Sequence, residues 1–232
     1  MSAEQDRRGQ PVRVVERVEP EPDREALEQA RRKLEQAWAV PGGFVGWFMA
    51  VDHKKIGIMY LVTAFAFFLI AGLLALVMRV QLAEPNAGVV SNATYNQLFT
   101  MHGTTMVFLV ALPLALGLAN YLVPLMIGAR DMAFPRLNAL SYWLYLFAGL
   151  LLYSSFVVDG APDNGWFMYA PLTAPQYSPG RAMDFWILAI LLISASSTAG
   201  SINIITTVAQ LRAPGMRLWR VPLFPWMMTF TS

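Results

Sequence analysis

The feature that most restricts the fold is a run of 32 residues, 98–129, without a single Asp, Glu, Lys or Arg. As a helix this run would be about 48 Å long, and the hydrocarbon core of a bilayer is only about 30 Å thick. The run therefore predicts a transmembrane helix. Inside it lies His102, and a polar group in that environment needs a partner. His102 is either a metal ligand, a common role of neutral histidine, or a structural histidine bonded to a neighbouring helix.

Charge is concentrated at the N-terminus. The chain of 232 residues is 56% hydrophobic and 14% charged, and residues 1–55 hold 10 of the 17 Lys and Arg and 10 of the 15 Asp and Glu. This distribution predicts a polar extension, residues 1–46, followed by a membrane domain, residues 47–232. The net charge of +2 gives no reason to expect a nucleic-acid partner. Because cysteine is absent, any metal or cofactor must use His, carboxylate, amide or backbone groups.

The extension has two parts. Residues 1–22 are rich in charge and proline, which predicts disorder. Residues 23–38 have a helical period that places five apolar residues on one face: Leu27, Ala30, Leu34, Ala37 and Trp38. This helix lies on the membrane surface, lies against a partner subunit, or is simply solvated. Pro41 ends it, and residues 44–51 suit a segment in the membrane interface.

The membrane domain is predicted to be all-α, a polytopic transmembrane helix bundle. Four complete spans are expected at residues 56–78, 98–129, 140–158 and 185–211. Pro113 and Pro124 should kink or break the second span. Apolar character returns at Val221, and the roughly twelve residues to Ser232 are too few to cross a bilayer. We therefore expect the sequence to stop inside a fifth span.

Basic residues alternate between the loops. The N-terminal flank, the second loop and the fourth loop hold most of them: Lys54, Lys55, Arg130, Arg136, Arg212, Arg217 and Arg220. The first and third loops contain only Arg79 and Arg181. Because Lys and Arg favour the cytoplasmic side, we expect a cytoplasmic N-terminus. His102 is then near the outer end of its span, and Asp131 is at the inner mouth.

Several polar side chains accompany His102 at the outer end. Arg79 suits a cofactor that carries oxygen or carboxylate groups, or it extends to the membrane surface. Gly103 would let a flat ring or another helix come close. Trp166 and Tyr169, in the third loop, suit an aromatic belt or a docking surface for a redox partner.

The inner end of the second span carries a different set. Asp131, with the amides of Asn120 and Asn138, suits the collection of protons and the ordering of water; alternatively, Asp131 is a helix N-cap in a basic loop. Asp52 is expected to cap the first span, and His53 is expected to be a solvated or capping histidine at the water boundary.

The fourth span contains eight small polar residues, which hold water or allow tight packing: Ser194, Ser196, Ser197, Thr198, Ser201, Asn203, Thr206 and Thr207. We favour packing for most of them. Asn203 is the best candidate for a water contact.

Six strings of sequence can now be taken together: DHKKIG at 52–57, LFTMHGT at 98–104, ANYLVPLMIGARDMAFPRLN at 119–138, GWFMYAPL at 165–172, SINIITT at 201–207 and LRAPGM at 211–216. From about Trp47 onward the chain closely resembles subunit I of the haem-copper terminal oxidases, in particular the cytochrome c oxidase branch. In that family a twelve-helix subunit holds a low-spin haem and a haem–copper centre, reduces O₂ to water and pumps protons. The resemblance implies a truncated, N-terminal fragment of such a subunit.

The resemblance also implies residue roles. His102 matches an axial ligand of the low-spin haem iron, with haem A the expected type, and Arg79 matches the arginine beside a substituent of that haem. Trp166 and Tyr169 fall in the loop near the haem propionates. Asp131 matches the carboxylate where a proton-uptake path begins. Other residues match groups along that path: Asn120, Asn138, Ser196, Ser197, Asn203 and, with a weaker match, Tyr60.

The family's other haem and copper ligands lie beyond residue 232, and two histidines cannot build a copper site. We therefore expect the fragment alone to be inactive. The implied partners are oxidase subunits II and III, cytochrome c as donor through subunit II, O₂ and membrane lipid, in a bacterial plasma membrane rather than a mitochondrial inner membrane. Two alternatives stay open: the quinol oxidase branch, and a haem-free transporter or proton channel in which His102 is a relay.

Overall fold

The computed structural model describes residues 24–37 and 43–232, and these form helices without strands, which confirms the all-α class. The elements are α1 (Arg24–Ala37), α2 (Gly43–Phe48), α3 (His53–Gln81), α4 (Asn92–Thr104), a π-helical segment (Thr105–Ala111), α5 (Leu112–Ile127), α6 (Pro135–Val158), α7 (Ala182–Gln210), a 3₁₀ turn (Leu218–Arg220) and α8 (Leu223–Thr231). Contacts divide the chain into two units, Met1–Gly43 and Phe44–Ser232.

The first unit contains α1, in the region where the sequence predicts a helix over 23–38. Leu27 and Ala30, from its predicted apolar face, are exposed. Glu28 and Arg32 form an ion pair of 3.9 Å one turn apart on the same helix. The predicted disorder of residues 1–22 lies outside the described residues.

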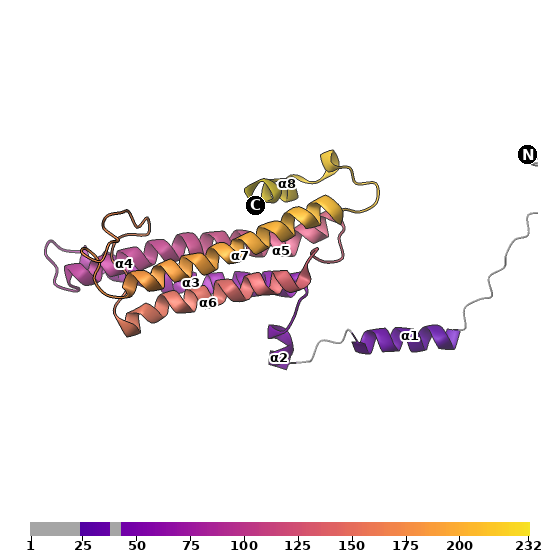
Figure 1. Cartoon of the computed structure of the whole chain (residues 1–232), viewed down its shortest axis with the longest axis horizontal. Coiled ribbons are helices and arrows are strands. Elements are labelled where there is room, and N and C mark those ends of the chain that lie inside the picture. The colour runs from indigo at the N-terminus through magenta and orange to yellow at the C-terminus, as the bar shows by residue number, and fades with distance from the viewer. Residues whose placement is uncertain (1–23, 38–42) are drawn as a thin grey trace, which may run out of the picture. The chain divides into compact units, whose positions relative to one another are not determined.

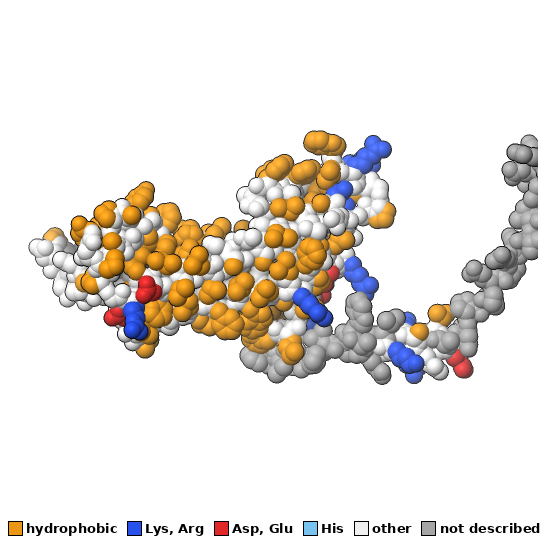
Figure 2. Space-filling view, viewed as in Figure 1, with side chains coloured by type: hydrophobic (Ala, Val, Ile, Leu, Met, Phe, Trp, Pro, Cys, Tyr) orange, Lys and Arg blue, Asp and Glu red, His pale blue; other side chains and the backbone are white. Residues whose placement is uncertain are grey.

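The second unit is a bundle of helices long and apolar enough to cross a membrane: α3, the continuous run Asn92–Ile127, α6 and α7. Figure 1 shows these helices alongside one another, with α8 against α5 and α7. Figure 2 shows hydrophobic side chains along the length of the bundle, with charged side chains near its ends. All four predicted spans are confirmed. Each helix begins before its predicted span because helix ends contain polar residues, which hydropathy does not detect.

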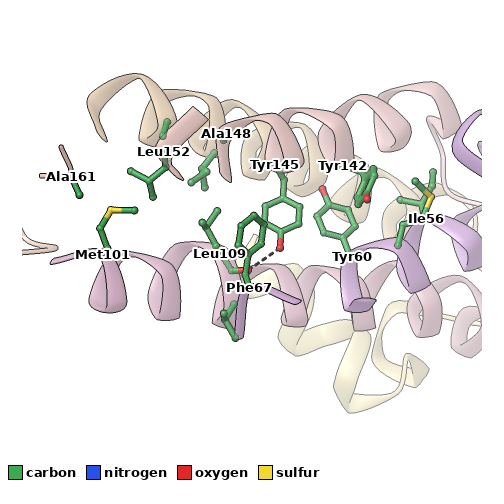
Figure 3. Close-up of a cluster of buried hydrophobic side chains, with 14 residues drawn as sticks. Ile56, Tyr60, Phe67, Met101, Leu109, Tyr142, Tyr145, Ala148, Leu152 and Ala161 are labelled. Carbon is green, nitrogen blue, oxygen red and sulfur yellow. Dashed lines mark hydrogen bonds between the residues drawn. The ribbon is translucent and has the colours of Figure 1, made fainter. Parts of the chain in front are cut away.

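The second span was expected to kink or break at its prolines; it stays helical through both, so the expected break is wrong. A π-helical segment, Thr105–Ala111, joins α4 to α5, and Pro113 is near the start of α5. In an α-helix the carbonyl of Leu109 would accept a hydrogen bond from residue 113, and proline has no N–H to donate. The hydroxyl of Tyr145 donates to that carbonyl instead, at 2.8 Å (Figure 3).

One buried cluster of the bundle lies between α3, α6, α7 and the second span, and a second lies mainly between α5, α7 and the segment after α7. The rings of Tyr60 and Tyr145 stack with centroids 5.3 Å apart, and Tyr142 meets Tyr60 edge-on at the same distance (Figure 3). α3 and α5 approach closely through Gly57 and Gly117: a Cβ at position 57 would lie 2.9 Å from the carbonyl oxygen of Gly117. Small residues at such a crossing let membrane helices pack backbone to backbone.

Candidate functional site

One ring nitrogen of His102, Nδ1, makes a hydrogen bond to a neighbouring helix, and the other, Nε2, is available to bind a ligand. Its Nδ1 donates to the backbone carbonyl of Ala71 in α3, at 2.9 Å. Because a carbonyl can only accept, Nδ1 carries the proton, and the lone pair is on Nε2. A metal-binding histidine is held in this way: the bond at the second nitrogen fixes its tautomer and its ring orientation.

Of the residues expected near His102, Trp166 lies beside Gly103, the residue that follows the histidine. A Cβ on Gly103 would lie 2.9 Å from Cδ1 of Trp166, so the flat ring that Gly103 admits is this indole. Arg79, in the last turn of α3, is exposed, and Tyr169 is exposed and contacts Phe167.

Asp131 is far from His102, because the helix from His102 to Ile127 is about 38 Å long at the usual rise per residue. α5 ends at Ile127, where Gly128 has the left-handed φ of 72° that suits a helix cap. Asp131 therefore lies in the loop beyond the helix. The N-cap residue of α6 is Phe134, so the alternative that Asp131 caps that helix is wrong.

Asp131 is instead paired with His53, the first residue of α3. Its Oδ1 accepts from the backbone N–H of His53 at 3.3 Å, from the Nδ1 of His53 at 3.1 Å and from the N–H of Met132 at 2.7 Å. The side chain of Asp131 is 32% exposed, and that of His53 is 1% exposed. One carboxylate oxygen of Asp131 is thus fixed by hydrogen bonds from the protein, while the side chain remains partly exposed.

The expectation of a solvated His53 is wrong. His53 is separated from Asp131 by 78 residues, so no local pattern announces the pair. Asp52 does cap α3, as predicted, by accepting from the N–H groups of Lys54 and Lys55. Partial burial of Asp52 raises its pKa, but the hydrogen bonds from these two lysines outweigh burial and hold the pKa below its ordinary value.

Unpaired polar atoms gather at this end of the bundle. Asn120 and Asn138 are buried, at 1% and 0% exposed. Four buried atoms have no hydrogen-bond partner within the described part of the chain: Nε2 of His53, Oδ1 of Asn120, and Oδ1 and Nδ2 of Asn138. Unpaired buried polar atoms are costly, and ordered water is their usual partner. These atoms therefore favour internal water near Asp131.

A buried chain of hydroxyl groups continues from Asn138. Ser141 donates to the carbonyl of Asn138 at 2.8 Å, and the hydroxyl of Tyr60 donates to Ser141 at 3.0 Å. Ser196 is 3.4 Å from the Tyr60 hydroxyl and donates to the carbonyl of Ser141. Sequence reasoning named Tyr60, Asn138 and Ser196 but missed Ser141, which follows Asn138 by one helical turn and so faces the same way.

Most small polar residues of α7 bond back to their own helix. Ser194, Ser197, Thr198, Thr206 and Thr207 each donate to a carbonyl of their own helix. Ser197 is partly buried and bonds back to Ser194.

Both polar groups of the Asn203 side-chain amide bond to the backbone of Phe134. Its Oδ1 accepts from the N–H of Phe134 at 2.9 Å, and its Nδ2 donates to the carbonyl of Phe134 at 3.1 Å. Thr207 accepts from the N–H of Ala133 at 2.9 Å. Asn203, expected to contact water, instead fastens the loop that carries Asp131.

Comparison with known proteins decides the family. A sequence model described as "Cytochrome C and Quinol oxidase polypeptide I" matches residues 55–232. The chain belongs to this family. The haem-copper oxidase subunit I relatives include a putative cytochrome c oxidase subunit 1-beta of Streptomyces avermitilis, 51% identical over 189 residues, which are 81% of this chain and 34% of the relative.

Two further relatives of this oxidase family extend the comparison. A haem-copper oxidase subunit I+III of Aeropyrum pernix is 54% identical over 186 residues, 80% of this chain and 23% of the relative. A cytochrome c oxidase subunit 1 of Corynebacterium efficiens is 45% identical over 193 residues, 82% of this chain and 33% of the relative. The chain thus spans about a quarter to a third of the length of these relatives.

The residues of this oxidase segment fit one contribution to a haem. Among residues 24–37 and 43–232, no three His, Cys, Asp or Glu side chains come together as they would around an ion held by protein ligands alone. A haem iron is held mainly by its porphyrin, so a protein segment can contribute to its binding with one imidazole. The imidazole of His102, with Nδ1 bonded to Ala71 and Nε2 left for a metal, fits such a contribution.

Proposed function

We propose that this chain is part of the catalytic-core subunit of a respiratory terminal oxidase, in which His102 is an axial ligand of a low-spin haem of the A type. The full-length protein passes electrons from cytochrome c through that haem to a haem–copper centre, reduces O₂ to water and pumps protons. The observation that carries this proposal is the bond from Nδ1 of His102 to Ala71, which leaves Nε2 as the metal-binding atom.

In this proposal the chain contributes to two functions of the oxidase, haem binding and proton entry. The haem, when bound, supplies one-electron transfer, and this chain orients it through His102, with Arg79, Trp166 and Tyr169 near its rim. Protons enter at Asp131 and move inward along water held by Asn120 and Asn138 toward Tyr60, Ser141 and Ser196. The polar atoms that lack protein partners at this end of the bundle support that path.

Names of the relatives support the donor and partners. Two relatives are named as cytochrome c oxidases, and a third is named as subunit I+III. We infer that cytochrome c, acting through subunit II, is the donor, and that subunit III is a neighbour. Bacterial relatives support a plasma-membrane location with the N-terminus in the cytoplasm. Two histidines cannot supply the full set of haem and copper ligands, so this segment by itself is inactive.

The test is a reduced-minus-oxidised spectrum of the full-length protein. His102→Ala is expected to lose the low-spin haem band, because it removes the ligand. His53→Ala is the matched control, since His53 is the other histidine of this chain, and its band should persist. An unchanged band in His102→Ala would contradict the ligand assignment. A colourless full-length protein would favour the haem-free transporter or channel instead.

A further inference from the structure

The turn of helix that carries His102 is tied to other parts of the bundle by polar contacts. Thr100 accepts from the backbone N–H of Gly165 at 2.8 Å, and Thr104 accepts from the indole N–H of Trp186 in α7 at 3.1 Å. Both threonine side chains are fully buried. Breaking either bond would leave a buried polar group unpaired, which is unfavourable, so these contacts hold the turn in place.

The π-helical segment begins directly after this turn. A π-turn adds a residue to the α-helical repeat, so it changes the rotation of the helix on its N-terminal side relative to the helix on its C-terminal side, and such turns are frequent at functional sites. Thr105, the first residue of the segment, is fully buried. It shares a hydrogen bond of 2.8 Å with the hydroxyl of Tyr153 in α6. The start of the π-helical segment is therefore anchored to a neighbouring helix.

We propose that Thr105 and Tyr153 are positioning residues for His102, and that their bond fixes the rotation at which the imidazole is presented to a haem. The inference rests on the proposed function, because it takes His102 to be a haem ligand. The bond from Nδ1 to Ala71 holds the far edge of the ring on α3. With Thr105 anchored on α6, His102 cannot turn about its helix axis without breaking one of the two bonds.

This arrangement has a measurable consequence. The orientation and hydrogen bonding of an axial ligand are among the means by which a protein sets the properties of haem iron. Releasing Thr105 should therefore change the spectroscopic signature of the low-spin haem, even though neither Thr105 nor Tyr153 supplies a ligand. A purely structural bond elsewhere in the bundle should not have this effect.

The chain offers a matched control for this bond. Thr63 and Tyr142 share a hydrogen bond of 3.0 Å between the same two side-chain types. That bond also joins a tyrosine of α6 to a threonine of a neighbouring helix, here α3. Tyr142→Phe therefore removes a tyrosine hydroxyl group from α6, as Tyr153→Phe does, but at a site away from the turn that carries His102.

The experiment uses the full-length oxidase with its other subunits. Electron paramagnetic resonance gives the principal g values of the oxidised low-spin haem, and a redox titration gives its midpoint potential. Tyr153→Phe and Thr105→Val are each expected to shift both quantities in the same direction. The double variant should shift them no further than either single variant, because the two changes remove one bond. Thr105→Ser, which keeps the hydroxyl, and Tyr142→Phe should resemble the wild type.

Two results would overturn the inference: unchanged g values and potential in both Tyr153→Phe and Thr105→Val, or an equal shift in Tyr142→Phe. Failure of the proposed function has a different signature, since His102→Ala would then keep the low-spin haem. Loss of that haem in His102→Ala, together with wild-type signals in both Tyr153→Phe and Thr105→Val, would refute the positioning role alone.

Discussion

At the scale of single residues, Asp131 is both anchored and partly exposed. Oδ1 accepts three hydrogen bonds, two of them from His53, while the side chain remains 32% exposed. A carboxyl group that is fixed in position and still partly exposed suits transfer of protons from the solvent.

Asp131→Asn removes the proton-carrying group and keeps the shape of the side chain. We expect slower turnover and slower proton uptake, by roughly tenfold or more, since positioned acid–base groups typically contribute about 10²–10⁴-fold. The haem spectra should stay intact, because Asp131 is far from His102. Proton uptake by the full-length oxidase during turnover measures the effect, and normal pumping in this variant would remove the role of Asp131.

His53 is expected to matter through its bond to Asp131. His53→Leu removes the Nδ1 contact of 3.1 Å and is expected to slow proton uptake several-fold, on the order of the loss of one charge-assisted hydrogen bond. His53→Asn places an amide nitrogen where Nδ1 lies and should retain most of the rate. Stopped-flow measurement of proton uptake distinguishes them, and equal rates in the two variants would argue against the pairing.

Sequence alone identifies residues whose chemistry is out of place. His102 could be named as a candidate site residue because a histidine inside an apolar run is unusual. Asp131 could be named because it lies two residues after the end of that run. The role of His53 was missed because burial and pairing depend on a contact 78 residues away. Ser141 was missed because one serine among many has no distinguishing local pattern.

At the scale of elements, the loop before α6 is held by α7. Asn203 pairs both backbone groups of Phe134, and Thr207 pairs the N–H of Ala133. No periodicity predicts this, because the backbone of a loop presents its N–H and carbonyl groups only once folded. Most of the small polar residues of α7 bond back to carbonyls of their own helix, as Ser and Thr commonly do.

Asn203→Leu should loosen this loop. The substitution leaves the N–H of Phe134 without its partner, at about 1–3 kcal/mol for a buried group, while the carbonyl of Phe134 keeps its bond from the N–H of Asn138. Faster amide hydrogen exchange is expected in residues 131–134, with slower proton uptake because Asp131 loses its fixed position. Thr207→Val should have a smaller effect of the same kind, and Thr207→Ser should have none. Unchanged exchange in Asn203→Leu would show that the loop is held by other contacts.

The second span shows why its predicted break is wrong. Proline removes a donor, but the hydroxyl of Tyr145 replaces it at the carbonyl of Leu109. Tyr145→Phe should therefore destabilise the protein by about 1–3 kcal/mol, the usual cost of an unpaired buried acceptor. Pro113→Ala supplies an N–H at residue 113, so the double variant should recover much of that loss. Thermal inactivation of the full-length oxidase measures both, and additive losses would contradict this account.

At the scale of the whole molecule, the direction of proton movement depends on orientation. The distribution of Lys and Arg predicts that the loop before α6 and the loop after α7 face the cytoplasm. With that orientation, the proposed function has Asp131 take protons from the cytoplasm and has His102 hold the haem near the outer face. Because this chain contains no cysteine, introduced cysteines report orientation without background from its own residues. Glu84, in the first loop, and Leu218, before α8, are exposed and suit this purpose.

We expect a membrane-impermeant maleimide to label Glu84→Cys in intact cells. Leu218→Cys should be labelled only after the membrane is permeabilised. The unsubstituted full-length protein shows whatever labelling arises outside this segment. The reverse pattern would place Asp131 on the outer side, so that protons would enter from the wrong compartment for a pump directed outward. Each charge moved across the membrane against 100 mV stores about 2.3 kcal/mol. The labelling pattern therefore decides whether proton uptake at Asp131 can contribute to energy storage.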